Sequence, residues 1–262
     1  MLQQTQVSRV LAHYGRFLRR FPSMRSLARA PRRDVILAWS GMGYNNRAVR
    51  LHALASVLVA RGMRIPADAP SLLELPGIGK YTAHAILSSV HGLPVPVVDV
   101  NIRRLLSRVF WRMRSTSDMK TDEEIWRKAG KILPRRGVYD WNQALMDIGA
   151  TICTARRPSC ARCPLHEVCA SGKTMMQARG RPGRPEAGRR GTPDRIYRGR
   201  IVEALRKRRD GFRAHALGRR IDPEFSAHDL PWLEKVLEGL ARDGLVRFRR
   251  GSRTSGSRVT LS

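Results

Sequence analysis

The sequence predicts a mainly α-helical protein with a cysteine-containing loop and a small winged-helix-like domain at its C-terminus. Apolar residues recur at three- and four-residue steps through residues 1–152, which is typical of amphipathic helices. All four cysteines lie in one short stretch, and two amphipathic helices followed by a basic hairpin end the chain. With 262 residues, of which 42% are apolar, the chain can form one large domain or two modest ones.

Segment 1–152 is predicted to be a succession of helices. The first apolar stripe, on one predicted helix face, consists of Val7, Val10, Leu11, Tyr14, Phe17, Leu18 and Phe21. A second stripe in "RAVRLHALASVLVARG" consists of Leu51, Leu54, Val57 and Leu58. The alternation typical of strands does not appear in this segment, so we expect a helical domain.

The charge balance predicts a polyanionic partner. The chain has 50 Lys and Arg residues against 21 Asp and Glu residues, a formal net charge of +29. A GC-rich genome would favour arginine over lysine, but it would not explain the shortage of acids, so we expect nucleic-acid binding. The sequence has neither an apolar stretch of about 18 residues nor a secretion signal. We therefore expect a cytoplasmic protein without membrane contact.

The four cysteines, Cys153, Cys160, Cys163 and Cys169, have the spacing C-x6-C-x2-C-x5-C. Intracellular proteins rarely keep disulfides, so thiolate ligation of a metal is the favoured interpretation. The close pair Cys160 and Cys163 can place two sulfurs on one ion, as in zinc sites and iron–sulfur clusters. The spacing by itself leaves zinc and iron open.

The rest of the chain divides by composition. After the cysteine loop, 153–171, residues 172–195 are rich in Gly, Pro and Arg and are predicted to be a flexible basic linker. In segment 196–262, "IYRGRIVEALRKR" and "LPWLEKVLEGLARDG" read as amphipathic helices, and "LVRFRR" and "RVTL" as the strands of a hairpin. This winged-helix-like domain would either pack against the first domain or contact DNA.

The stretch "LPGIGKYTAHAIL", residues 75–87, predicts a tight turn between two helices. Pro76 ends a short helix, and Gly77 and Gly79 allow positive φ and leave the backbone bare. A new helix begins near Lys80, and its free N–H groups suit a phosphate group. The alternative is an ordinary turn between helices.

Asp99 follows an apolar run and begins a helix that contains Ile102, Leu105, Leu106 and Val109. Its simplest role is an N-cap that accepts from the amide of Asn101 or Ile102. A catalytic role is compatible with this, because a carboxylate held in place at a site could stabilise a developing sugar cation.

These three elements, in this order, resemble the helix–hairpin–helix DNA glycosylase superfamily with a [4Fe-4S] cluster. The cysteine spacing is that of the family's cluster loop, and the resemblance therefore implies iron rather than zinc. Within the superfamily, "MLQQTQV" (1–7) and "GMGYNNRA" (41–48) are similar to adenine DNA glycosylases of the MutY type. The resemblance spans residue 1 to about 170.

The resemblance implies a role for each matching residue. Asp99 would stabilise the oxocarbenium-like sugar, and Asn101 matches an active-site asparagine. Cys153, Cys160, Cys163 and Cys169 would hold the cluster. Residues expected to contact DNA are Gly77 and Gly79 with Lys80 and Thr82 at the turn between helices, Gln4 and Thr5 near the opposite base, Met42 and Tyr44 at the opposing 8-oxoguanine, and Arg47.

Tyr81 stands where the related endonuclease III enzymes have a lysine that forms a Schiff base and cuts the strand. Tyrosine cannot form a Schiff base, and Lys80 would face elsewhere on the helix, so we expect a monofunctional glycosylase. The resemblance implies a monomer that removes adenine opposite 8-oxoguanine or guanine in duplex DNA, associated with the bacterial nucleoid. The alternatives are a thymine or uracil mismatch glycosylase and a non-catalytic DNA-binding relative.

The sequence departs from the family pattern at three places. The family's general-acid glutamate would lie two residues before Met1, so we expect a start placed too far downstream and weak or absent excision by the chain as written. The tail is too short and too helical for the Nudix-like domain that many relatives use for 8-oxoguanine. Val100 replaces a frequent glycine.

Overall fold

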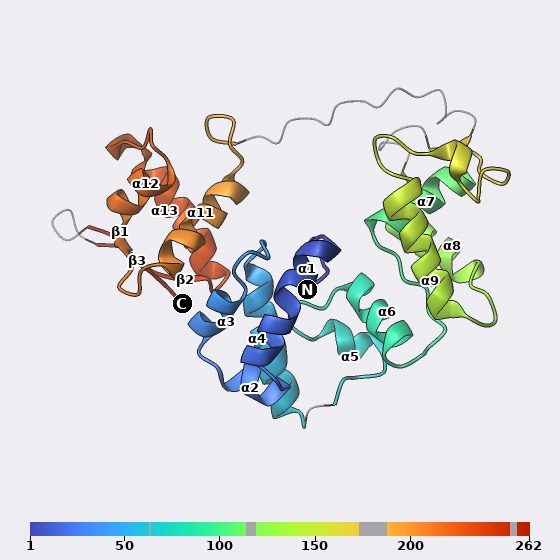
Figure 1. Ribbon diagram of the computed structural model, residues 1–262, viewed down its shortest axis with the longest axis horizontal. Coiled ribbons are helices and arrows are strands. Elements are labelled where there is room, and N and C mark those ends of the chain that lie inside the picture. The colour runs from blue at the N-terminus through green and yellow to red at the C-terminus, as the bar shows by residue number, and fades with distance from the viewer. Residues whose placement is uncertain (63, 114–118, 173–187, 252–255) are drawn as a thin grey trace. The chain divides into compact units, whose positions relative to one another are not determined.

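The computed structural model describes residues 1–62, 64–113, 119–172, 188–251 and 256–262 (Figure 1). It forms two compact units, which we call unit 1 (Met1–Ile65 with Pro185–Ser262) and unit 2 (Pro66–Arg184). The predicted mainly helical fold with a small C-terminal sheet is confirmed. None of the helices in the described ranges has the length and apolar character needed to cross a membrane. The domain boundaries at 152, 171 and 195 stay predictions.

The N-terminal part of unit 1 is a group of four helices: α1 (Val7–Arg20), α2 (Met24–Arg29), α3 (Arg32–Ala38) and α4 (Asn46–Ala60). Its core contains Val10, Phe17, Phe21, Leu27, Val35, Trp39, Met42, Ala48 and Ala55. The first predicted stripe is only partly buried. Phe17 packs edge-on against Phe21 and Trp39, whereas Leu11 and Tyr14 of the same helix are exposed. The periodicity predicted the helix correctly but made its buried face too wide.

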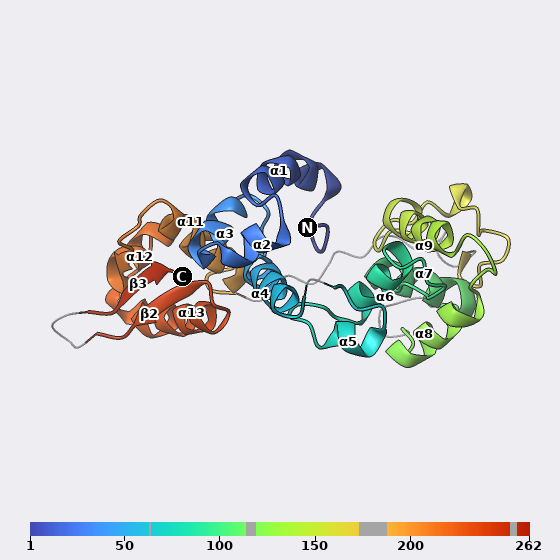
Figure 2. The same ribbon diagram turned by 90° about the horizontal axis from the view of Figure 1, so that it is seen from below.

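The C-terminal part of unit 1 contains α11 (Asp194–Arg206), β1 (Phe212–Arg213), α12 (Ala214–Ile221), η4 (Ala227–Asp229), α13 (Leu230–Arg242), β2 (Val246–Arg249) and β3 (Arg258–Leu261). The strands form an antiparallel sheet in the order β1-β3-β2, with the helices against one face (Figure 2). Phe248 and Val259 face each other across the sheet and belong to the core. This arrangement is the predicted winged-helix topology.

The C-terminal part packs against α3 and α4 of the same unit. Ile36 belongs to its hydrophobic core, and Arg206 donates to the carbonyl oxygen of Ile36 at 3.0 Å and to Asn45 Oδ1 at 2.8 Å. Of the two roles left open by the sequence, packing is therefore present. A further contact to DNA is compatible with it.

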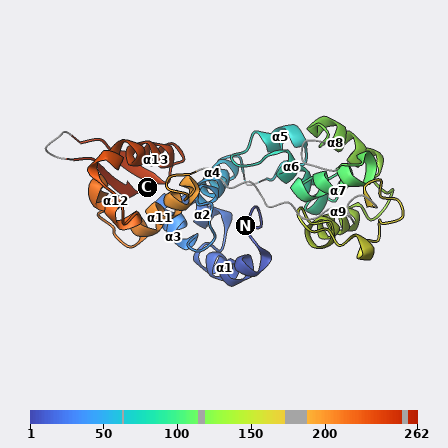
Figure 3. The same ribbon diagram turned by 90° about the horizontal axis from the view of Figure 1, so that it is seen from above.

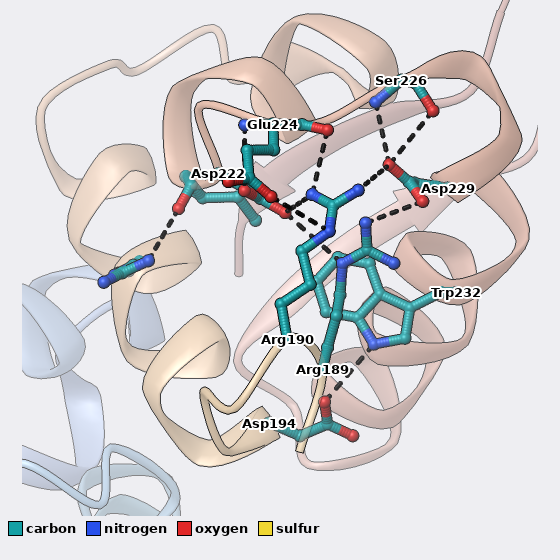
Figure 4. A network of polar contacts seen from close by, with 10 residues as sticks. Arg189, Arg190, Asp194, Asp222, Glu224, Ser226, Asp229 and Trp232 are labelled. Carbon is teal, nitrogen blue, oxygen red and sulfur yellow. Dashed lines mark hydrogen bonds and ion pairs between the residues drawn. The ribbon is translucent and has the colours of Figure 1, made fainter.

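Two adjacent arginines hold the segment before α11 against the C-terminal part (Figure 4). Arg189 contacts Asp222 at 3.3 Å and Asp229 at 2.7 Å, and Arg190 contacts Asp222 at 3.1 Å. The Arg189 guanidinium also lies 4.6 Å from the ring centroid of Trp232. Residues 173–187 of the predicted linker lie outside the described residues, but its last residues are fixed by these ion pairs.

Unit 2 contains α5 (Ala69–Leu73), α6 (Lys80–Ser89), α7 (Val100–Trp111), α8 (Asp122–Lys131), α9 (Val138–Asp147), the π-helical turn η2 (Ile148–Ile152) and the short η3 (Cys160–Arg162) (Figure 3). Helix α7 lies in the core, with Ile102, Leu105 and Leu106 almost fully buried. It packs against α8, α9 and η2. This placement fixes the N-terminus of α7, where Asp99 lies.

Candidate active site and iron–sulfur loop

The glycine turn connects α5 to α6 as the sequence predicted. Gly77 has φ +78°, but Gly79 has φ −103°, so the expected positive φ is wrong for Gly79. A Cβ at Gly79 would meet nothing within 4 Å, and Gly79 gives α6 no side-chain cap. The backbone at the start of α6 is therefore open to a partner that accepts hydrogen bonds, such as a phosphate group.

Asp99 is the N-cap of α7, as expected. Its Oδ1 accepts from the amides of Asn101 at 2.9 Å and Ile102 at 2.7 Å. Its Oδ2 accepts from Asn101 Nδ2 at 2.9 Å, so Asn101 supplies both a backbone and a side-chain donor. The carboxylate remains partly exposed. Three donors thus fix an accessible anion at the helix terminus.

Tyr81 and Lys80, neighbours on α6, have different surroundings. The Tyr81 hydroxyl donates toward Met146 Sδ at 3.9 Å, and burial, together with the charge of Asp99, raises the pKa of the phenol. Lys80 Nζ lies 4.3 Å from the ring centroid of Trp126 and 3.9 Å from Asp122 Oδ2. The amine is therefore directed toward α8, and the phenol beside Asp99 stays protonated at neutral pH.

Arg104, which the sequence analysis missed, connects Asn101 to the cysteine loop. Its guanidinium donates to Asn101 Oδ1 at 3.2 Å, to the carbonyl oxygen of Gly149 at 2.5 Å and to that of Cys153 at 2.9 Å. Its position three residues after Asn101 places both side chains on the same helix face, and this spacing could have indicated the contact. A continuous chain of hydrogen bonds therefore runs from Asp99 to the first cysteine.

Gly149 permits this close approach of η2 to α7. A Cβ at this position would lie 3.0 Å from Asn101 Cβ and 3.1 Å from its carbonyl oxygen. Real Cβ atoms rarely come so close to another residue, because these distances are shorter than ordinary van der Waals contact. The missing side chain of Gly149 therefore helps to fix the position of Asn101.

The four cysteines line one small pocket of unit 2, beside Arg108 and His166. Burial, and then the neighbouring cysteines, raise the pKa of the Cys160 thiol, and burial is the main cause of the raised pKa of Cys169. Thiolates held this close repel one another unless metal ions balance their charge. Among the described residues, no three His, Cys, Asp or Glu side chains are arranged around one metal ion. In a four-iron cluster each thiolate binds a different iron, so the cysteine set fits such a cluster.

Arg108 organises the loop from inside. Its guanidinium donates to the carbonyl oxygens of Thr154 at 2.7 Å and Ala155 at 3.0 Å and lies 3.4 Å from Cys153 Sγ. The end of the loop returns to α7, where the amide of Ser171 donates to the carbonyl oxygen of Arg108 at 3.1 Å. The four cysteines would hold the cluster, and Arg108 would place a positive charge beside one sulfur.

The two loops of unit 1 at residues 1–5 and 41–45 each present an exposed residue in a strained backbone conformation. Gln4 has φ +55° and Tyr44 has φ +43°, backbone values that residues other than glycine rarely adopt. The Tyr44 side chain is 50% exposed, and Gln4 is also exposed. Both were predicted to contact DNA, and both are free to do so in unit 1.

Arg47 holds these two loops together. It is 8% exposed, and it donates to the carbonyl oxygen of Met1 at 2.9 Å, to that of Gln3, and to Thr5 Oγ1 at 2.6 Å. It also reaches the carbonyl oxygen of Met42 at 3.2 Å, which Thr5 Oγ1 contacts at 3.1 Å. We therefore assign Arg47 and Thr5 to positioning rather than to direct DNA contact. Met42 is 1% exposed, and we assign its side chain to the core.

The comparisons with known proteins identify the family. Residues 1–131 match the model described as "HhH-GPD superfamily base excision DNA repair protein". The chain belongs to this superfamily. Residues 153–169 of this HhH-GPD chain match the "iron-sulfur binding domain of endonuclease III", and the cofactor is a [4Fe-4S] cluster.

Curated relatives place the HhH-GPD chain in the MutY-type branch. It is 36% identical over 255 residues to an adenine DNA glycosylase of Mycobacterium tuberculosis, covering 94% of this chain and 79% of the relative. It is 36% identical over 170 residues to an adenine DNA glycosylase of Buchnera aphidicola, covering 64% of this chain and 49% of the relative. The chain spans about half the length of the Buchnera relative and a smaller share of the mammalian ones.

A solved structure of a thermostable thymine-DNA glycosylase is also similar. Its TM-score is 0.60 at 28% sequence identity, and the match covers 66% of this chain and 80% of the other.

Proposed function

We propose that the chain is an adenine DNA glycosylase that removes adenine opposite 8-oxoguanine or guanine by hydrolysis of the N-glycosidic bond. It would act as a monomer on duplex DNA in the bacterial nucleoid. The observation that carries the proposal is the accessible Asp99 carboxylate, fixed by three donors at the start of α7. The relatives named adenine DNA glycosylase support adenine as the base.

The reaction requires that the target nucleotide leave the base stack, because the glycosidic bond is shielded inside the duplex. Breaking this bond leaves positive charge on the sugar, which the Asp99 carboxylate would stabilise. Asn101 would hold the carboxylate in place through its side-chain amide. A general acid must protonate the departing adenine. We assign no described residue to that step.

The enzyme is expected to be monofunctional. The protonated phenol of Tyr81 cannot form a Schiff base with the sugar, and the Lys80 amine is engaged by Asp122 and Trp126. Borohydride reduction during the reaction would therefore trap no covalent complex between protein and DNA. A trapped complex that disappears in Lys80→Arg would contradict this expectation.

A thymine or uracil mismatch glycosylase is the second candidate. The similarity to the solved thymine-DNA glycosylase structure, at 28% sequence identity and a TM-score of 0.60, supports this candidate. Tyrosine at position 81 agrees with either activity. A non-catalytic DNA-binding protein is the third possibility.

Excision under single-turnover conditions, with the chain in excess, separates the three candidates. The duplexes carry A opposite 8-oxoguanine, A opposite G, T opposite G, or U opposite G. Because no described residue is assigned to the general-acid step, we expect weak but Asp99-dependent release from the two adenine duplexes, and Asp99→Asn serves as the internal reference for catalysis. Release from the T or U duplexes alone would support the second candidate. Binding with no Asp99-dependent release from any duplex would support the third.

A further inference from the structure

The outer face of the C-terminal sheet carries a row of arginines. In β1 and β3, Arg213 pairs with Arg258, and in β2 and β3, Arg249 pairs with Arg258. These three side chains therefore lie side by side across all three strands, and Arg247 follows two positions along β2. All four are exposed, whereas Phe248 and Val259 on the opposite face contribute to the core.

This row is electrostatically unfavourable by itself. Like charges directly opposite each other on neighbouring strands destabilise a sheet. Within the described part of the chain, none of the four has an acidic partner; Arg258 donates only to the carbonyl oxygen of Asp210, at 3.1 Å. Arg250, one residue beyond β2, is different, because it forms ion pairs with Glu234 and Glu238. The four arginines of the sheet face therefore keep an unbalanced positive charge, whereas the neighbouring Arg250 is balanced by two glutamates.

We propose that this face, formed by Arg213, Arg247, Arg249 and Arg258, is a second DNA-binding surface that contacts the phosphate backbone of a duplex. Neighbouring strands are about 4.8 Å apart, so the row spans roughly 10 Å. Each strand of a duplex carries one charge per about 3.4 Å of helix axis, so several phosphates fall within reach of the row. Arginine is also well suited to phosphate, because its guanidinium can donate two parallel hydrogen bonds.

The surface differs from the usual winged-helix contact, in which a helix enters the major groove. The corresponding helix, α13, bears Glu234 and Glu238, which bind Arg250 and would approach the DNA with the wrong charge. Contact through the sheet reaches phosphates but no base edges. It therefore increases affinity without sequence preference and independently of a mismatch.

The choice of DNA rests on the proposed function, but the test measures binding and not excision. Affinity of the full chain for an undamaged, fully paired DNA duplex is measured by fluorescence anisotropy over a range of salt concentrations. The test variant is Arg213→Gln/Arg247→Gln/Arg249→Gln. The matched control, Arg219→Gln/Arg220→Gln/Arg242→Gln, removes the same charge from exposed positions on α12 and α13.

We expect the test variant to bind the duplex at least about tenfold more weakly. The slope of log affinity against log salt should fall by about 0.9 for each lost phosphate contact, or roughly 2 to 3 in total. The control should change both quantities less. Equal losses in the two variants would mean that only net charge matters and would overturn the proposal. So would a larger loss for an RNA duplex than for DNA.

The same variant tests whether the row serves the fold instead. Because the substitutions remove repulsion between Arg249 and Arg258 and between Arg213 and Arg258, the thermal unfolding midpoint without DNA should not decrease. A clear decrease would assign the arginines to stability and overturn the proposal, whatever the binding result. Excision of adenine can be absent without affecting either outcome.

Discussion

Polar groups are held in place in two different ways in this molecule. One is seen around Asp99 in unit 2, and the other in the loops at residues 1–5 and 41–45 of unit 1. At Asp99 the donors come from residues two and three positions further along the chain. In unit 1, Arg47 gathers acceptors from residues 1–5 and 42–43, most of them more than 40 positions away in the sequence. The Asp99 region is therefore stabilised by local helix capping, whereas the unit 1 loops are stabilised by the buried Arg47 guanidinium.

This difference has consequences for mutation. The Asp99 region should tolerate a cap-conserving substitution structurally and lose only its chemistry. The unit 1 loops should lose their structure when Arg47 is changed, because Arg47 donates to Gln3 and Thr5 on either side of the strained Gln4 and to Gly43 next to the strained Tyr44.

The largest effect is expected for Asp99→Asn. Asparagine is also a good N-cap, so unit 2 should remain folded while the charge proposed to stabilise the sugar cation is lost. Single-turnover excision of adenine should fall by about 10²- to 10³-fold. The matched control is Asp68→Asn, which changes the aspartate N-cap of α5 and should leave the rate nearly unchanged. Equal rates for Asp99→Asn and the unsubstituted chain would remove Asp99 from the reaction.

Arg47→Ala should lower the free energy of unfolding of unit 1 by about 3 kcal/mol, because several acceptors lose a charged donor at once. Urea unfolding measures this change. Hydrogen exchange should also show faster exchange in residues 1–5 and 41–45. Arg50→Ala, an exposed position on the same helix, should stay within about 0.5 kcal/mol of the unsubstituted chain. If the two variants are equally stable, Arg47 is not the residue that organises the loops.

Two glycine substitutions in the turn between α5 and α6 distinguish backbone strain from DNA contact. Gly77→Ala should lower the free energy of unfolding by about 1 to 2 kcal/mol, because Gly77 has positive φ. Gly79→Ala should hardly change stability, since its φ is negative and the space around it is open, but it should weaken DNA binding. Unchanged DNA affinity of Gly79→Ala would contradict a phosphate contact at this turn.

The smallest effect is expected for Tyr81→Phe at high pH. Burial and the Asp99 charge raise the pKa of Tyr81 above its ordinary value near 10. The resulting stabilisation is present below that pH and is lost as the pH rises through the folded-state pKa. Stability of Tyr81→Phe, measured by urea unfolding, should therefore fall less steeply above pH 10. The control is Tyr139→Phe, at an exposed tyrosine on α9, and an identical slope in both variants would contradict the assignment.

Features built from local sequence were predicted well. Helix periodicity, the Asp99 cap, the turn at Gly77 and the hairpin of the last strands all depend on residues close together in the chain. For the same reason the cysteine spacing was sufficient to recognise a metal-binding loop.

Features that depend on long-range burial were not predictable in this way. The motif in residues 41–48 suggested DNA contacts for Met42 and Arg47, yet the first lies in the core and the second is enclosed by backbone carbonyls. Composition likewise could not show that Arg189 and Arg190 find Asp222 and Asp229 some 30 to 40 residues later. The sequence alone does not distinguish an arginine enclosed by backbone carbonyls, such as Arg47, from an arginine on the surface.

The contact at Gly149 affects how sequence variation in this protein should be interpreted. Position 149 is distant in sequence from both the Gly77–Gly79 turn and Asp99, and glycine has no side chain that could contact DNA. Yet a single added methyl group there would press on Asn101 and, through it, on the carboxylate. A variant at this position would look harmless by its chemistry, but its effect on activity would resemble that of a substitution at Asp99, the proposed catalytic residue.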